Sequence, residues 1–137
     1  MQHRRVGRIS EFRGHYSEGI DINPHYADAA RSGFPNARLH VGCDLRAFED
    51  NRFETVVASD VLEHIPDDAL ALSKFVRIAR FNELLSVPKE DAISPPHSRV
   101  TYRPYLDPTH VHYYTKERLS TMVRHWGGYT LRVEDTY

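Results

Sequence analysis

Three aspartates stand where short apolar segments of the sequence end. Asp21, Asp44 and Asp60 each close or directly follow such a segment. If these segments are parallel strands, their carboxyl ends lie at the edge of the sheet where ligands bind. A carboxylate there can accept both hydroxyls of a ribose, which predicts a nucleoside ligand. Two other interpretations stay open: Asp21 caps the helix that begins at Pro24, and Asp44 has a cap or loop role.

Three histidines are candidates for proton transfer, namely His64, His110 and His112. The ordinary pKa of histidine lies near neutrality, so a neutral ring can take a proton from an acceptor hydroxyl. His64 could instead hold its turn through a backbone carbonyl. His110 and His112 would share one face of a strand and could bind a metal, but no third ligand stands at a suitable spacing. We therefore predict no metal site, and expect one of these two to line an acceptor site beside Tyr105 and Tyr113.

Strand and helix patterns alternate along the chain and position these residues. Strands are predicted at 18–22, 38–41, 53–58, 83–87 and 129–134, and the third is a continuous apolar run typical of a strand covered on both faces. Helices are predicted over 25–31, from Pro66-Asp67 with an apolar face of Leu72, Phe75, Val76 and Ala79, and after Thr115 with a face of Leu119, Met122, Val123 and Trp126. This alternation predicts an α/β fold with a mostly parallel sheet and helices on both faces.

Length and composition exclude several classes of protein. The chain has 137 residues, which predicts a single domain over 1–137. Its 18 Lys+Arg residues are balanced by 19 Asp+Glu residues, so no nucleic acid is expected as a partner. No apolar run approaches ~18 residues, so no membrane partner is expected. The single cysteine, Cys43, excludes an internal disulfide and fits a cytoplasmic protein.

Five segments resemble class I S-adenosylmethionine-dependent methyltransferases in order and spacing. They are Gly19-Ile-Asp-Ile-Asn-Pro, Cys43-Asp-Leu, Phe53-Glu-Thr-Val-Val-Ala-Ser-Asp-Val-Leu-Glu-His-Ile-Pro-Asp, Leu85-Ser-Val-Pro-Lys and Tyr105-Leu-Asp-Pro-Thr-His-Val-His-Tyr-Tyr-Thr. The last is similar to a segment of members that modify glycans or related metabolites. The resemblance covers about Gly7 to Tyr137 and implies a Rossmann-like methyltransferase fold.

The resemblance also implies a role for each matching residue. Asp21 would hold the ribose hydroxyls of S-adenosylmethionine, Ile22 would pack against the adenine, and Asp44 with Leu45 would lie at the adenine edge. Ser59 and Asp60 would line the methionine part, while Glu63 and His64 would face the site from the turn after the strand. The acceptor implied is a small molecule or a glycan, and His64, His110 and His112 are its candidate bases.

One part of the family pattern is missing. The glycine-rich loop of the family falls on His3, Arg5 and Gly7, so that only Gly7 is retained as a cofactor-binding glycine. Residues 1–5 are too polar for a central buried strand, and the first strand is therefore expected to be absent or replaced. Its loss would expose backbone groups on two inner strands. We expect these strands to pair directly or a homodimer to cover them, unless the chain is a shortened form of a longer protein.

Three functions are compatible with these observations. The first is methyl transfer from S-adenosylmethionine to a small-molecule or glycan acceptor. The second is a non-catalytic relative that serves as a binding or assembly module after loss of the glycine loop. The third, a fragment of an NAD-dependent oxidoreductase, explains Asp21 but does not explain the segment from Ser59 to Asp67.

Overall fold

The computed structural model describes residues 16–42, 44–88 and 107–126, which form parts of two compact units. The N-terminal unit covers residues 1–48 and the C-terminal unit covers residues 49–137, and each is described by itself. Gly7, Cys43, Tyr105 and the predicted strand at 129–134 lie outside the described residues. The prediction of a single domain stays a prediction.

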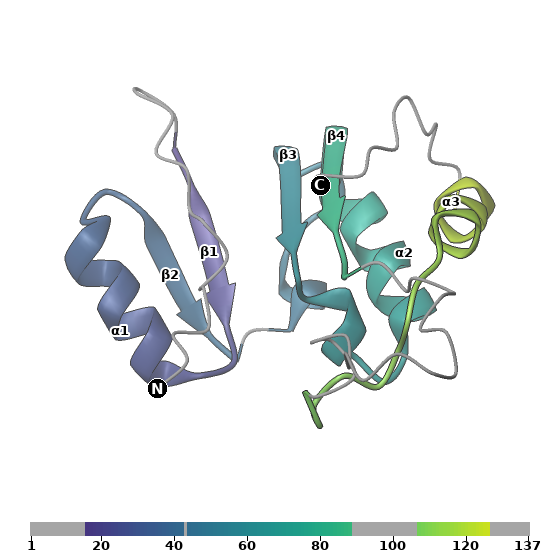
Figure 1. The fold of residues 1–137 in the computed structure, drawn as a ribbon. Helices are drawn as coiled ribbons and strands as arrows, with labels where there is room; N and C mark the ends of the chain where they lie inside the picture. Colours follow the sequence, from purple (N-terminus) through teal and green to yellow (C-terminus); the bar gives the residue numbers. More distant parts are fainter. Residues whose placement is uncertain (1–15, 43, 89–106, 127–137) are drawn as a thin grey trace. The chain divides into compact units, whose positions relative to one another are not determined.

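The N-terminal unit contains two parallel strands and one helix. Strand β1 (Glu18–Asp21) pairs in register with β2 (Arg38–Val41), and α1 (Pro24–Gly33) connects them and lies beside their sheet (Figure 1). Asn23 begins the helix because its side chain accepts a hydrogen bond from the His25 amide, and proline follows at the first helical position. Ala27 and Ala30 are the buried residues of this helix. The predicted strand–helix–strand order is confirmed here.

The C-terminal unit is built on a second pair of parallel strands. After the short 3-10 helix η1 (Leu45–Ala47), which precedes this unit, β3 (Phe53–Ser59) leads into the 3-10 helix η2 (Leu62–His64) and α2 (Asp68–Ile78). Helix α2 continues directly into β4 (Ala79–Ser86), which pairs with β3, and α3 (Lys116–His125) follows later in the chain. In Figure 1, α2 lies beside the β3–β4 sheet.

Packing within the C-terminal unit differs in two ways from the sequence prediction. Helix α2 ends at Ile78, and Ala79 already belongs to β4, so the buried face consists of Ala71, Leu72, Phe75 and Ile78. The β3–β4 sheet is covered on one face only by the described residues, since Val57 and Leu84 on the other face are 55% and 60% exposed. Within the described residues, the predicted burial of β3 on both faces is therefore not seen.

The described strands form two separate two-stranded sheets, β1–β2 and β3–β4. Direct pairing of β1 with β3, which we expected if the first strand is absent, is not among the pairings of the described residues. Homodimer formation stays a prediction. Parallel pairing and the alternation of strands with helices confirm the α/β class.

Glu83 is an acidic residue on the face of the sheet that α2 covers. Its register partner on β3 is Val56, and one of its carboxylate oxygens, Oε1, is buried without a hydrogen-bond partner among the described residues. Burial raises the pKa of Glu83 from 4.5 to about 7, because the charged form loses its hydration.

Replacing Glu83 with glutamine is expected to stabilise the protein at pH 8 but not at pH 4. Because the folded-state pKa is raised, the unfolded chain releases this proton near pH 4.5, whereas the folded chain keeps it until about pH 7. The unfolding free energy of the original chain therefore falls across this window. Glu83→Gln has no carboxyl to ionise, so its unfolding free energy does not fall in this way. Above pH 7, urea titrations should show the variant to be about 1–2 kcal/mol more stable than the original chain, allowing for partial solvent screening.

The exposed carboxylate of Glu54 on the neighbouring strand offers the matched control. Glu54→Gln should change stability by less than about 0.5 kcal/mol at every pH. An equal stability gain for both variants, or a gain for Glu83→Gln that is independent of pH, would contradict the burial argument.

Candidate active site

The carboxyl ends of β3 and β4 lie side by side and carry polar residues. Ser59 and Ser86 are partners in the register, and their hydroxyl oxygens are 2.7 Å apart. The Asp60 amide donates to the Ser86 carbonyl at 2.9 Å, and Asp60 has a positive φ of 53°. Aspartate is one of the few residues that adopt this left-handed conformation readily, and it turns the chain sharply out of the strand.

The turn after β3 presents Glu63 and His64 on η2. Leu62, which is 1% exposed, anchors this turn in the core. The Glu63 carbonyl accepts hydrogen bonds from the amides of Val111 at 2.8 Å and His112 at 3.3 Å. These backbone bonds bring a segment more than forty residues later in the chain onto the turn.

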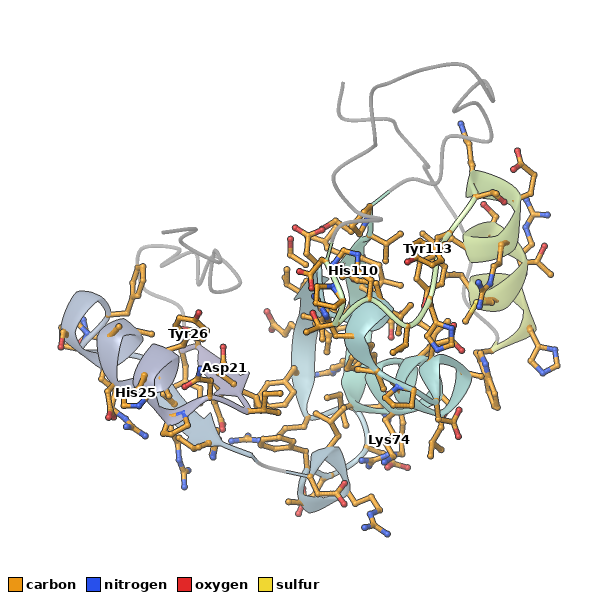
Figure 2. All side chains as sticks on the ribbon, turned by 60° about the horizontal axis from the view of Figure 1, so that its bottom comes forward. Asp21, His25, Tyr26, Lys74, His110 and Tyr113 are labelled. Carbon is orange, nitrogen blue, oxygen red and sulfur yellow. The ribbon has the colours of Figure 1, made fainter. Side chains whose placement is uncertain are left out.

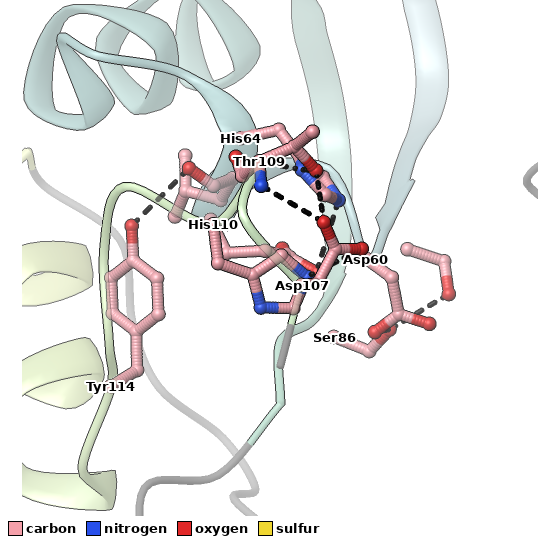
Figure 3. A network of polar contacts seen from close by, with 10 residues as sticks. Asp60, His64, Ser86, Asp107, Thr109, His110 and Tyr114 are labelled. Carbon is pink, nitrogen blue, oxygen red and sulfur yellow. Dashed lines mark hydrogen bonds and ion pairs between the residues drawn. The ribbon is translucent and has the colours of Figure 1, made fainter. Parts of the chain in front are cut away.

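His64 and His110 come together through this contact. Their ring centroids are 4.7 Å apart and their planes are inclined by 75°. Nδ1 of His64 lies 3.2 Å from the Thr109 carbonyl oxygen and 3.0 Å from the Thr109 hydroxyl. Asp107 accepts from the Thr109 amide at 2.9 Å, and its other oxygen lies 3.7 Å from Nε2 of His110 (Figure 3). Two histidines of the three predicted from the sequence are therefore neighbours.

Glu63 is the most unusual group of this cluster. The residue is 1% exposed, and neither carboxylate oxygen has a hydrogen-bond partner among the described residues. Its Oε1 lies 3.8 Å from Nε2 of His64. Burial raises the pKa of Glu63 to about 7, against a smaller lowering by its own backbone amide, and the negative charges of Asp60 and Asp107 add to the rise.

His112 belongs to a different network. Its Nε2 lies 2.9 Å from the Pro66 carbonyl oxygen, and its Nδ1 lies 3.7 Å from the Asp68 carboxylate. Asp68 also accepts from the Tyr114 hydroxyl at 2.9 Å and from Arg118 at 3.1 Å. These contacts join α2 to the start of α3 and give His112 a structural position. Its predicted role as a base stays a prediction.

The predicted ribose-binding residue lies at the end of β1 in the N-terminal unit, beside the start of α1 (Figure 2). Asp21 Oδ1 accepts a hydrogen bond of 2.7 Å from the Asn23 amide, which holds the carboxylate in a fixed orientation. This contact supports the helix entry, as one of the two interpretations expected. The next side chain, Ile22, is 87% exposed and available to pack against a flat ring.

The two predicted residues at the adenine edge have local contacts of their own. Asp44 caps η1 through the Arg46 amide at 2.9 Å and forms an ion pair with the Arg46 side chain at 2.6 Å. Leu45 is the first residue of η1. The cap role of Asp44 was one of the interpretations that the sequence left open. An adenine amino group would have to share this carboxylate with Arg46.

The sequence reasoning missed Asp107 and Thr109, which orient the histidine pair. The pattern Asp107-Pro-Thr109 does carry a signal, because an aspartate that accepts from the amide two residues later forms a typical turn. What the pattern could not show is that this turn lies against His64.

One family model and one solved structure are similar to this chain. A family model described as a methyltransferase domain matches residues 7–86. The fold also matches the crystal structure of a protein from Bacillus halodurans assigned as a methyltransferase, with a TM-score of 0.52 and 20% sequence identity. That match covers 82% of this chain but 59% of the other. No curated protein matches the chain. Within the described residues, no helix is long and apolar enough to cross a membrane.

Proposed function

The chain belongs to the methyltransferase domain family, and from this premise we propose that it transfers a methyl group from S-adenosylmethionine to a hydroxyl of a small molecule or glycan. The observation that carries the proposal is the cluster of Glu63, His64 and His110 beside the carboxyl end of β3. Parallel α/β sheets bind their ligands at this end of the strands.

The N-terminal unit has residues that fit the adenosine part of the cofactor. The Asp21 carboxylate is held at the end of β1 by the hydrogen bond from the Asn23 amide to Oδ1. Among the described residues Oδ2 has no hydrogen-bond partner, and it can accept from a ribose hydroxyl. The exposed side chain of Ile22 follows it and offers an apolar surface to an adenine ring. When bound, the sulfonium of the cofactor supplies an already activated methyl group, so the protein mainly has to align the acceptor.

The histidine cluster provides a place for the acceptor hydroxyl. If the N–H at Nδ1 of His64 donates a hydrogen bond to the Thr109 carbonyl, Nε2 keeps a lone pair and can take the proton of the acceptor hydroxyl. Asp107 and Thr109 restrict the rotation of both rings, which preserves this orientation between turnovers. The small-molecule or glycan nature of the acceptor rests on the resemblance of the segment from Tyr105 to Thr115.

Calorimetric titration of the full chain with S-adenosylmethionine and S-adenosylhomocysteine tests this proposal. We expect saturable binding of both ligands with one site per chain. If neither ligand gives a heat of binding at millimolar concentration, and the two ligands do not compete with each other, cofactor use would be contradicted. That result would favour the non-catalytic binding or assembly module.

A further inference from the structure

We propose that Glu63, His64 and His110 form a binding site for a divalent transition-metal ion of the Zn²⁺ type. This inference does not depend on methyl transfer, because the three side chains would bind the ion whether or not the chain turns over a cofactor. One donor atom from each residue lies within 4.8 Å of the other two. Two imidazole nitrogens and one carboxylate oxygen are a donor set that zinc enzymes use, with a fourth position open to water or substrate.

The buried carboxylate is the independent observation that points to a cation. Glu63 is 1% exposed, yet both oxygens have no hydrogen-bond partner among the described residues. A buried carboxylate without partners is costly, and proteins normally retain one only where it is paired or binds a metal. The carboxylates of Asp60 and Asp107 add negative potential around Glu63 and would favour a cation further.

Each of the two histidines has a polar group of a neighbouring residue next to one of its ring nitrogens. Nδ1 of His64 is held by the Thr109 hydroxyl and carbonyl, so Nε2 is the nitrogen directed to Glu63. One ring nitrogen of His110 lies near the Asp107 carboxylate. Metal-binding histidines usually make such a second contact to a carboxylate or carbonyl, because it fixes the ring and raises its basicity.

Metal binding and proton transfer make different demands on His64. The Nε2 lone pair that would accept a proton in the metal-free chain would be used by the ion in the loaded chain. A bound ion would then hold the acceptor oxygen at its open position and lower the pKa of its hydroxyl. The same cluster can therefore exist in two forms, one without metal in which His64 accepts a proton and one in which His64 binds the ion. Direct measurement of metal binding shows which form the chain adopts.

Titration of the metal-free full chain with Zn²⁺, in the absence of any cofactor, tests the site. The original chain should bind one Zn²⁺ ion. Glu63→Gln and His110→Ala should each weaken the affinity for this ion at least about 100-fold, since loss of even a residue that only contacts a metal ligand costs about 10–100-fold in affinity. With Co²⁺ as the probe, visible absorption bands of a nitrogen-ligated ion should appear in the original chain and not in the variants. His25→Ala, which removes an exposed histidine on α1, should change neither result.

Thermal melting in the same samples shows whether the variants fold. Without metal, Glu63→Gln should melt at or above the temperature of the original chain, because the variant no longer buries a carboxylate that lacks a hydrogen-bond partner among the described residues. Zn²⁺ should raise the melting temperature of the original chain alone. Equal Zn²⁺ affinity in the original chain and in Glu63→Gln, or affinity weaker than millimolar in the original chain, would overturn the proposal. Cofactor titration is a separate readout, so failure of the metal site leaves the proposed function standing.

Discussion

Replacing Asp21 with alanine is expected to weaken the binding of S-adenosylhomocysteine by about 100-fold. A hydrogen bond to a charged group contributes about 1.5–3 kcal/mol, and loss of one such bond between Oδ2 and a ribose hydroxyl, at about 2.8 kcal/mol, corresponds to about 100-fold. Calorimetry on the full chain measures this change. The effect should be equally large for S-adenosylmethionine, because the adenosine part is common to both ligands.

Two further variants separate ribose binding from support of the turn. Asp21→Asn keeps an oxygen that can accept from the Asn23 amide, but it loses the charge and one acceptor. If Asp21 holds the ribose, Asp21→Asn should lose most of the affinity while the chain stays folded. Asp28→Ala removes an exposed carboxylate of α1 that pairs with Arg31, and it should bind normally. Normal binding by Asp21→Asn would mean that Asp21 serves only the helix entry.

Replacing Asp68 with alanine is expected to destabilise the C-terminal unit by about 2–3 kcal/mol. The Asp68 carboxylate receives the Tyr114 hydroxyl at 2.9 Å and Arg118 at 3.1 Å, and Tyr114 is 1% exposed. Among the residues that the structure describes, removing the acceptor would leave this buried hydroxyl with only a longer contact to the Leu62 carbonyl, at 3.4 Å. Asp68 also lies in the first turn of α2, where a negative charge is favourable. Urea unfolding measures the loss.

A double-mutant cycle with Tyr114→Phe identifies the cause of that loss. If the hydroxyl and the carboxylate act as a pair, the two single changes should cost more when added than the double variant costs, by about 1–2 kcal/mol. Strict additivity would show that Asp68 acts without Tyr114, through Arg118 or the first turn of α2. Asp67→Ala, which removes the cap on the Leu70 amide, is the control and should cost about 1 kcal/mol without coupling to Tyr114.

Local signals in the sequence predicted most of the elements correctly. Asn23 and Thr115 begin their helices through side-chain hydrogen bonds, as their types and positions indicated. The boundary between α2 and β4 was harder, because Ala79 continues the helical spacing of apolar residues. At Ala79 the backbone changes directly from helix to strand, with a ψ of 130° and no intervening loop. No glycine or proline marks this boundary in the sequence.

The candidate site could be predicted only in part. The strand end and the position of His64 in the turn after β3 followed from the pattern around Ser59 and Asp60, because these residues lie within one continuous segment. Pairing of His64 with His110 depends on backbone hydrogen bonds between Glu63 and the segment that follows Thr109. No periodicity relates these segments, so a search for a third metal ligand by spacing near His110 and His112 could not find Glu63.

The proposed function requires that this chain binds S-adenosylmethionine through residues at the carboxyl ends of its strands. Titration of the isotope-labelled full chain with S-adenosylhomocysteine, followed through its backbone amide signals by NMR, tests it most directly. We expect saturable shifts for Asp21, Ile22, Ser59 and Asp60, and little change for the residues of α3. Unchanged signals at these four positions with millimolar ligand, or shifts confined to other elements, would contradict it.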